Sequence, residues 1–298
     1  MTPRTRVGFV GLGNMGGRIS RRVHEAGFEL VGFDRDADRA AAAGVAAAAS
    51  LADLVAASDV VLLSLPDSTV VEEVVLGDGG ILEHARAGQI VVDLSTSAPS
   101  STVELHRRLA ERGVELVDAG ISGGAAAAEA GTLTIMAGGS EAALDAARPL
   151  LATFSAHVHH MGASGAGHTA KLLNNFLNGI SLAATAEVMI AARSAGLDLR
   201  TFLDVLNTSS GVNFATLNRF PRIVEGDYLE GGLTGRLMLK DLRLYVDVVQ
   251  ALGTPALTAE GCVAAFETAE RLGYGDQISN RVVDALGDLA GGVRLQDP

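Results

Sequence analysis

A lysine and three asparagines share one face of a predicted helix in the second half of the chain. Lys171, Asn174, Asn175 and Asn178 follow i, i+3, i+4, i+7 spacing. Most other positions of this segment are apolar, so we expect the helix to be buried. A buried ammonium is costly unless it is paired or loses its proton, and lysines whose pKa is lowered by burial serve in proton transfer near neutral pH. The alternative is a solvated lysine on an ordinary amphipathic helix.

A glycine-rich loop near the N-terminus has the residue types needed to bind a dinucleotide. It follows the apolar run of residues 7–10 and has the pattern G-x-G-x-x-G. The first glycine permits a tight turn, the second lets the backbone approach a pyrophosphate, and the third allows a helix to pack closely. A glycine turn without a nucleotide is the alternative. The candidate cofactor-binding residues of this loop are Gly11, Leu12, Gly13, Asn14, Met15 and Gly16.

An acidic residue at the end of the next apolar run bears on the choice of cofactor. Asp34 is placed to accept hydrogen bonds from the hydroxyls of the adenine-side ribose, and it would repel a 2′-phosphate. Arg35 follows directly, and an arginine there can stack on adenine or hold a 2′-phosphate. We therefore predict NAD as the cofactor and leave NADP open.

A serine and two glycines follow a later apolar run. Ser122, Gly123 and Gly124 can present a hydroxyl beside two backbone N–H groups, which suits a carboxylate or phosphate. An ordinary glycine turn is the alternative.

The elements that must position these residues alternate in type up to about residue 161. Short runs of Val, Leu and Ile alternate with helical patterns, which predicts a parallel sheet covered on both faces. The expected strands are 6–10, 30–33, 60–65, 90–93, 114–118 and 133–137, and the expected helices between them are 15–26, 51–57, 69–76, 101–112 and 141–154.

No convincing strand is predicted after that point. The expected helices are 166–195, 199–206, 216–224, 237–252, 258–272 and 276–289. We therefore expect an α/β Rossmann-type domain over residues 1–163 and an all-α domain over residues 164–298, with the lysine helix at their junction.

Composition limits the class of protein. The chain has 298 residues, and its net charge of −12 argues against nucleic acid or an anionic membrane as the main partner. Its one cysteine, Cys262, excludes an intrachain disulfide, and no signal peptide is apparent, so we expect a cytoplasmic protein. Three histidines at 157, 159 and 160 have no cysteine or carboxylate in register, so no metal site is predicted.

Five motifs in order resemble the β-hydroxyacid dehydrogenase family, which includes the 3-hydroxyisobutyrate dehydrogenases. They cover nearly the whole chain, and together they are much more specific than any one alone. They are the glycine-rich loop, Asp93-Leu94-Ser95-Thr96, the segment 118–139, Gly165-Ala166-Gly167 with Lys171, Asn174 and Asn175, and Leu239-Lys240-Asp241-Leu242.

The resemblance implies a role for particular residues. Lys171 matches the catalytic lysine, and Asn175 matches the asparagine that orients the substrate. Ser122, Gly123 and Gly124 match the turn that binds the substrate carboxylate, and Ser122 is included among the catalytic candidates. The remaining cofactor positions implied are Leu65 and Pro66 beside the ribose, and Thr96 and Lys240 along the nicotinamide end. The family also implies a homodimer or homotetramer that assembles through the helical domain.

Some residues depart from the common pattern of the family. Gly120 stands where proline is frequent, Leu233 where an aromatic residue is frequent, and residues 125–128 are all alanine. These positions form the pocket wall in the family, so they leave the substrate identity open.

The leading hypothesis is an NAD-dependent dehydrogenase of a small β-hydroxy acid, with Lys171 as general acid and base. A decarboxylating dehydrogenase of a phosphorylated sugar acid and an imine reductase are the enzymatic alternatives. A non-catalytic dinucleotide-binding scaffold is the alternative from another class.

Overall fold

The computed structural model describes residues 5–296 and separates the chain into two compact units. Unit 1 ends at Lys171, and unit 2 begins at Leu172. The division falls inside one continuous helix, so the domain boundary expected near residue 163 stays a prediction.

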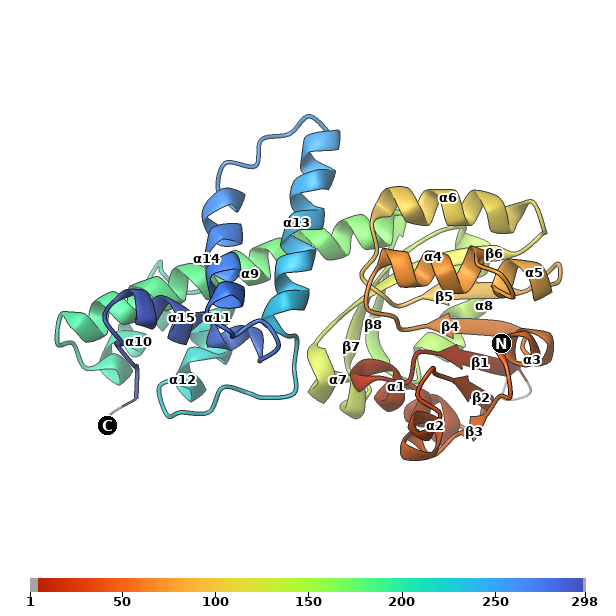
Figure 1. The fold of residues 1–298 in the computed structure, drawn as a ribbon, viewed down its shortest axis with the longest axis horizontal. Coiled ribbons are helices and arrows are strands. Elements are labelled where there is room, and N and C mark those ends of the chain that lie inside the picture. Colours follow the sequence, from red (N-terminus) through yellow and green to blue (C-terminus); the bar gives the residue numbers. More distant parts are fainter. Residues whose placement is uncertain (1–4, 297–298) are drawn as a thin grey trace. The chain divides into compact units, whose positions relative to one another are not determined.

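Unit 1 contains a sheet of eight strands within the described residues, in the order β3-β2-β1-β4-β5-β6-β7-β8 (Figure 1). All neighbouring strands are parallel except β6 and β7. The strands are β1 Arg6–Val10, β2 Glu29–Phe33, β3 Ala46–Ala47, β4 Val60–Leu63, β5 Ile90–Asp93, β6 Glu115–Ser122, β7 Leu133–Gly138 and β8 Ser155–Gly162. The predicted Rossmann-type sheet is confirmed, although the expected strands included neither the short β3 nor β8, and the sequence pattern did not indicate the antiparallel pair.

The antiparallel pair has a simple cause in the chain between its strands. Residues 123–132 connect β6 to β7, and they include only the short helix α7, Gly124–Ala130. A parallel return requires a crossover of roughly a dozen residues or more, so this short connection turns the chain back beside β6.

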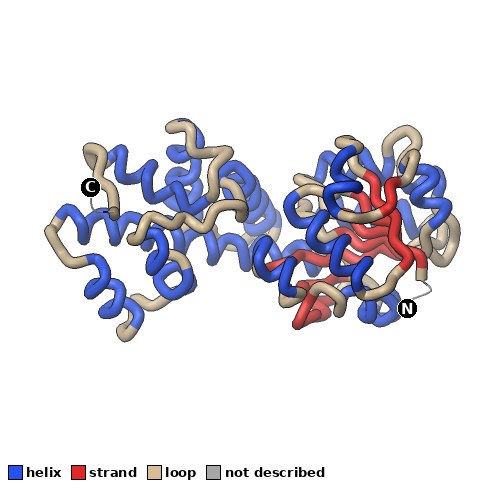
Figure 2. Tube along the Cα trace, turned by 90° about the horizontal axis from the view of Figure 1, so that it is seen from below, coloured by secondary structure: helices blue, strands red, loops and turns tan. Residues whose placement is uncertain are grey.

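Helices cover both faces of this sheet (Figure 2). Alternate strand residues point to opposite faces: Phe9 and Leu62 pack in one apolar cluster with α1 and α8, and Val61 and Leu63 pack in another with α3, α4 and α6. The helices are α1 Asn14–Glu25, α2 Asp38–Ala43, α3 Leu51–Ala57, α4 Ser68–Leu76, α5 Ile81–His84, α6 Pro99–Ala110 and α8 Glu141–Leu151. Every residue of β4 is buried, which explains its uninterrupted apolar sequence.

The strand order determines where a ligand can bind in unit 1. The chain winds outward from β1 to β3 on one side and from β4 to β6 on the other. Ligands of such sheets bind beyond the carboxyl ends of the strands at this reversal. The loops after β1, β4 and β5 lie there, and all three contain candidate residues.

Unit 2 is helical throughout its described residues. Its core contains residues from both its long and its short α-helices, including Leu182, Phe220, Met238 and Phe266. The elements are α9 Ala166–Ser194, which begins in unit 1, α10 Leu199–Asn207, α11 Phe214–Asn218, α12 Phe220–Ile223, α13 Gly235–Ala251, α14 Ala259–Arg271, the 3₁₀ helix Ser279–Arg281 and α15 Val282–Leu289.

The prediction of one continuous helix over residues 216–224 is wrong. Two short helices occupy this segment, and the first begins early because Asn213 caps it by accepting hydrogen bonds from the backbone of Ala215 and Thr216. Pro221 lies in the first turn of α12, where its missing N–H is tolerated. Arg219 separates the two helices, and its φ of −115° departs from the helical value near −63°.

Helix α9 is long and apolar enough to cross a membrane by length and composition alone. This is weak evidence, because core helices of soluble proteins pass the same test, and 56% of its most apolar window is buried inside the protein.

Candidate active site

The glycines of the loop between β1 and α1 are required by its geometry. Gly11 has φ of +88°, and a Cβ there would lie 2.3 Å from the backbone oxygen of Ser64. A Cβ at Gly16 would lie 1.9 Å from the backbone oxygen of Gly11, so α1 packs directly on the loop. Among the described residues, a Cβ at Gly13 would approach only Arg39, whose Nη1 would be 3.1 Å away.

The surface over Gly13 therefore remains open to a group that needs close backbone approach. A pyrophosphate is such a group, and the N-terminus of α1 directly follows the loop. Of the other loop residues, Leu12 and Met15 pack into the unit 1 core, and Asn14 begins α1. The residues present fit a dinucleotide, and the loop would hold its phosphates.

Asp34 is held in place at the end of β2. Its Oδ2 accepts a hydrogen bond of 2.7 Å from the Leu12 N–H, and its Oδ1 accepts one of 3.0 Å from the Asp36 N–H. The carboxylate is thus attached to the glycine-rich loop. Arg35 is exposed, and no ion pair involves it within residues 5–296.

Arg39 is a residue near this site that the sequence reasoning missed. Its Nε lies 3.9 Å from Asp34 Oδ1 and 3.3 Å from Asp36 Oδ2. It lies five positions after Asp34, within the first turn of α2, so only the fold of the β2–α2 loop brings it back over Gly13.

The loops after β4 and β5 are joined by a serine. Ser95 Oγ accepts a hydrogen bond of 2.9 Å from the Leu65 N–H. Asp93 is buried and holds the same loop, because its Oδ1 accepts from the Ser95 N–H at 2.9 Å and its Oδ2 accepts from the Ser97 hydroxyl at 3.1 Å. Leu65, Pro66 and Thr96 therefore lie on adjacent loops at the carboxyl edge of the sheet.

The serine and glycines of the candidate carboxylate turn lie where β6 ends and α7 begins. Ser122 is half-buried and is paired with Thr134 of β7. Gly123 and Gly124 have φ of +128° and +71°, which glycine adopts readily and other residues rarely do. A Cβ at Gly123 would also lie 2.6 Å from that of Ala127. The backbone conformation therefore requires both glycines.

Lys171 is buried at the second turn of α9, with 9% of its surface exposed. Its side-chain stem packs on β6 at Gly120, two residues before Ser122. The start of α9 is fixed by Asp118, a fully buried residue of the same strand. The Asp118 carboxylate accepts hydrogen bonds from the backbone N–H groups of Gly165, at 2.8 Å, and His168, at 2.9 Å. A carboxylate at a helix N-terminus is favoured by the helix dipole.

His168 lies one turn before Lys171 and is fully buried. Its Nδ1 is 2.7 Å from the Thr102 hydroxyl, and its Nε2 is 3.9 Å from Asp93 Oδ2. His168 therefore packs at the start of α9 and connects this helix to α6 and to the Asp93 loop.

Asn175 follows Lys171 by one helical turn and belongs to unit 2. Its Nδ2 donates a hydrogen bond of 2.6 Å to Asp241 Oδ2, and both residues are buried. The Nζ of Lys240 lies 3.0 Å from the other Asp241 oxygen. Asp241 therefore fixes the plane of the Asn175 amide and holds the Lys240 ammonium. The sequence placed Asp241 in a motif but assigned it no role.

The other two asparagines of the predicted face have different partners. Asn174 is exposed, and its Nδ2 donates a hydrogen bond of 3.4 Å to Asn175 Oδ1. Asn178 accepts a hydrogen bond of 2.9 Å from Arg219. Burial lowers the pKa of Arg219 to about 10. Cys262 lies in the unit 2 core, and burial raises the pKa of its thiol to about 12.

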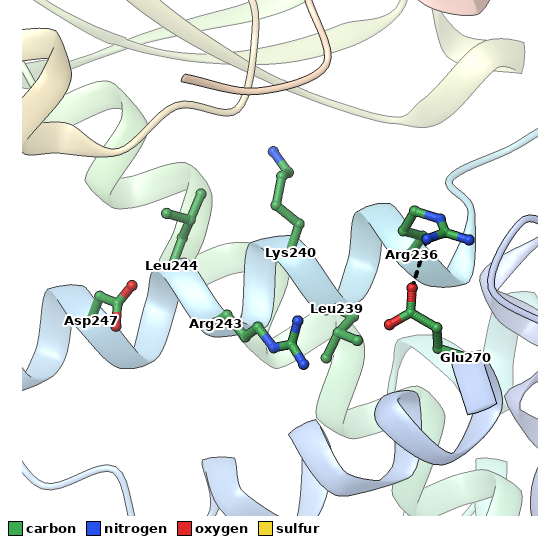
Figure 3. A pocket seen from close by; sticks show the side chains of 7 residues that line it. All are labelled: Arg236, Leu239, Lys240, Arg243, Leu244, Asp247 and Glu270. Carbon is green, nitrogen blue, oxygen red and sulfur yellow. Dashed lines mark ion pairs between the residues drawn. The ribbon is translucent and has the colours of Figure 1, made fainter. Parts of the chain in front are cut away.

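A pocket of about 370 Å³ lies along α13 and α14 in unit 2 (Figure 3). Three basic side chains of α13 line it at i, i+4, i+7 spacing, with Lys240 in the middle. Arg236 is paired with Glu270 at 3.0 Å, so the charge of the pocket is largely compensated. The lining residues are Arg236, Leu239, Lys240, Arg243, Leu244, Asp247 and Glu270.

Two protein families match successive parts of the chain. Residues 6–162 match the family described as the NAD binding domain of 6-phosphogluconate dehydrogenase, and residues 165–286 match the family described as the NAD-binding domain of NADP-dependent 3-hydroxyisobutyrate dehydrogenase.

Individual relatives cover nearly all of the chain. The chain is 33% identical to the 2-(hydroxymethyl)glutarate dehydrogenase of Eubacterium barkeri, over 98% of each chain. It is 36% identical to the NAD-dependent L-serine dehydrogenase of Pseudomonas aeruginosa, over 91% of this chain and 94% of the relative. The solved 3-hydroxyisobutyrate dehydrogenase of Mycobacterium tuberculosis with L-serine is 32% identical, with a TM-score of 0.85 over 95% of this chain and 99% of that one.

Proposed function

Because this chain belongs to the β-hydroxyacid dehydrogenase family, we propose that it oxidises the alcohol of a small β-hydroxy acid with Lys171 as the general base. The protein is an NAD(P)-dependent oxidoreductase that acts on a CH–OH group. A bound nicotinamide would supply the hydride acceptor for oxidation at the carbon that carries the hydroxyl.

The observation that supports the proposed role of Lys171 is the rarity of lysine in this chain. Only two of its 23 basic side chains are lysines, Lys171 and Lys240, and the rest are arginines. An arginine cannot release its proton in a protein, whereas a lysine can. Lysine is thus kept at a buried position, one turn before Asn175 and against the strand that ends at Ser122. In the oxidative direction its amine takes the hydroxyl proton, and in the reductive direction it returns that proton.

The substrate carboxylate is held by the turn after β6. The Ser122 hydroxyl and the backbone N–H groups of Gly123 and Gly124 donate hydrogen bonds to it. Asn175, fixed by Asp241, orients the substrate. The relatives are named for hydroxy acids that share this carboxylate and differ beyond it, so the class of substrate is a small β-hydroxy acid.

The cofactor is NAD in preference to NADP. Asp34 is held by two backbone N–H groups and presents a carboxylate to the adenine-side ribose. Thr96 and Lys240 are assigned to the nicotinamide end. The single, buried cysteine supports a reducing compartment, and we place the enzyme in the cytoplasm.

The test follows nicotinamide absorbance with NAD and NADP against 3-hydroxyisobutyrate, serine, glycerate, threonate and 2-(hydroxymethyl)glutarate. We expect turnover with NAD, and we expect Lys171→Ala to lower kcat by about 10²–10⁴-fold, the usual contribution of a positioned proton-transfer group. Lys171→Arg keeps the charge but cannot release a proton, so it should be equally impaired.

The matched control is Leu173→Ala, which changes an exposed side chain on the same helix and should retain wild-type turnover. Binding of NAD should be retained in every variant. Full turnover in Lys171→Ala would contradict the proposed mechanism. If the enzyme turns over imines or phosphorylated sugar acids but no small β-hydroxy acid, the proposed substrate class is wrong.

A further inference from the structure

The catalytic helix rests directly on the backbone of strand β6 at one glycine. A Cβ built on Gly120 would lie 2.5 Å from the Cβ of Lys171 and 2.9 Å from its Cγ. Both distances are well inside van der Waals contact. No other residue type therefore fits at position 120 while Lys171 stays where it is.

The backbone of Gly120 does not itself require glycine. Its φ lies outside the left-handed region, unlike those of Gly123 and Gly124. It lies within β6, paired with Met136 of β7, in a conformation open to residues with side chains. The stem of Lys171 is therefore what excludes a Cβ at this position.

The clash could not be relieved by a change of rotamer. The nearest atom is the Cβ of Lys171, which is fixed to the backbone of α9 and does not move with χ1. A side chain at position 120 would have to displace the helix itself.

The helix has little freedom to move, because further glycines allow it to pack closely on the sheet. A Cβ at Gly167 would lie 2.5 Å from the backbone oxygen of Asp118 and 2.6 Å from the backbone oxygen of Met136. A Cβ at Gly138 would lie 2.6 Å from Asp118 Oδ1, the atom that accepts from the Gly165 N–H. The first turns of α9 are thus in backbone contact with β6 and β7 and are tied to them by the Asp118 carboxylate.

We propose that Gly120 is a positioning residue that sets the location of the Lys171 amine by letting its stem lie on strand β6. This inference rests on the proposed role of Lys171. Gly120 also departs from the family pattern, in which proline is frequent at this position. A misplacement of about 1 Å at a reacting group can cost 10²-fold in rate, which sets the size of the expected effect.

The experiment compares Gly120→Ala with Gly77→Ala in the full-length enzyme. Gly77 is a matched control, because a Cβ there would lie 2.4 Å from the backbone oxygen of Glu73 at the end of α4. In Gly120→Ala we expect kcat to fall by about 10²-fold and the pH profile of kcat to shift, with the KM for NAD near its wild-type value. Gly77→Ala should lose stability without a change in the pH profile.

A second readout does not depend on turnover. The chain has two lysines, so protein labelled with ¹³C only at lysine gives two side-chain NMR signals, and Lys171→Ala assigns them. We expect Gly120→Ala to move the Lys171 signal and its titration midpoint, with Lys240 as an internal reference. Unmoved signals and an unchanged pH profile would overturn the proposal.

The outcomes separate the two proposals. Full activity in Lys171→Ala would remove the proposed mechanism, whatever Gly120→Ala does. An inactive Lys171→Ala beside a Gly120→Ala enzyme that behaves like Gly77→Ala would overturn only the positioning role. Should Gly120→Ala fail to fold, adding Lys171→Gly removes the clashing atoms. The double variant should then fold as stably as Lys171→Gly, and continued failure to fold would contradict the proposed contact.

Discussion

At the scale of single residues, the site depends on side chains whose partners fix one orientation. Asn175 is oriented by Asp241, and Asp34 is oriented by the Leu12 and Asp36 N–H groups. Each of these polar groups is buried or half-buried and hydrogen-bonded, so moving it costs the loss of a partner. The residues assigned to ligands are therefore held in position by the protein itself.

Coenzyme choice should respond to the charge of residue 34. Asp34→Asn keeps an acceptor for the Leu12 N–H but removes the carboxylate that repels a 2′-phosphate. We expect the ratio of kcat/KM with NAD to kcat/KM with NADP to fall by about 10-fold, or ~1.4 kcal/mol. Steady-state kinetics with both coenzymes measures it. Arg35→Gln is the companion variant, and it reveals whether the exposed arginine helps to bind NADP. If the ratio of kcat/KM with NAD to kcat/KM with NADP is unchanged in Asp34→Asn, Asp34 does not contribute to coenzyme selection.

At the scale of elements, buried polar contacts tie loops and helices together in both units. In unit 2 the Tyr228 hydroxyl donates a hydrogen bond of 2.7 Å to Asp284 of α15, and the guanidinium of Arg281 stacks on the Tyr228 ring with its Cζ 3.6 Å from the centroid. Burial, followed by the hydrogen bond to Asp284, raises the pKa of Tyr228 to about 12. This contact links the segment after α12 to the last helix.

The raised pKa of Tyr228 predicts a loss of stability at alkaline pH. The folded state keeps this proton more tightly than the unfolded chain, whose tyrosine titrates near 10. The contribution is therefore complete below pH 10 and is lost as the pH rises toward 12. Tyr228→Phe should remove this alkaline component and lower the free energy of unfolding at neutral pH by roughly 1.5–3 kcal/mol, the value of a hydrogen bond to a charged group.

Denaturant unfolding between pH 7 and 11 measures both effects. Tyr245→Phe is the control, because it keeps the ring that stacks on Phe176 with centroids 4.0 Å apart. An identical pH dependence in wild type and Tyr228→Phe would contradict the assignment.

At the scale of the whole molecule, each unit has its own apolar core. Unit 1 carries the dinucleotide loop, and unit 2 carries Asn175, Asp241 and Lys240. Helix α9 begins in unit 1 and continues into unit 2, and Lys171 and Asn175 lie one turn apart on it. The homodimer or homotetramer expected from the family stays a prediction.

Cofactor binding should stabilise unit 1. A ligand present at 100 times its Kd adds about 2.7 kcal/mol to the free energy of unfolding of the state that binds it. For a unit of this size, that corresponds to a rise in Tm of roughly 5–10 °C. We expect NAD to produce this rise in calorimetry and NADP to produce less at the same concentration. A larger shift with NADP would contradict the role given to Asp34.

The class of fold and the class of reaction follow from patterns in the amino-acid sequence. The glycine-rich loop, the alternation of strands and helices, and the spacing of Lys171 and Asn175 are local patterns, and local patterns depend on backbone geometry that can be read from neighbouring residues. The predicted strands, including the one over residues 133–137, and the lysine helix are observed within a few residues of their expected bounds. Membership of the family rests on the same ordered motifs.

The contacts that hold these residues in place depend on long-range packing. The Asp118 cap on α9, the Asp241 contact to Asn175 and the Gly120 seat of Lys171 join positions from 47 to 66 residues apart, and nothing in the local pattern indicates such pairings. The antiparallel β7 likewise depends on the short return after β6, and Arg39 comes to lie over Gly13 only through the fold of a loop. Partners of buried polar groups are chosen by three-dimensional packing, and spacing along the chain does not encode it.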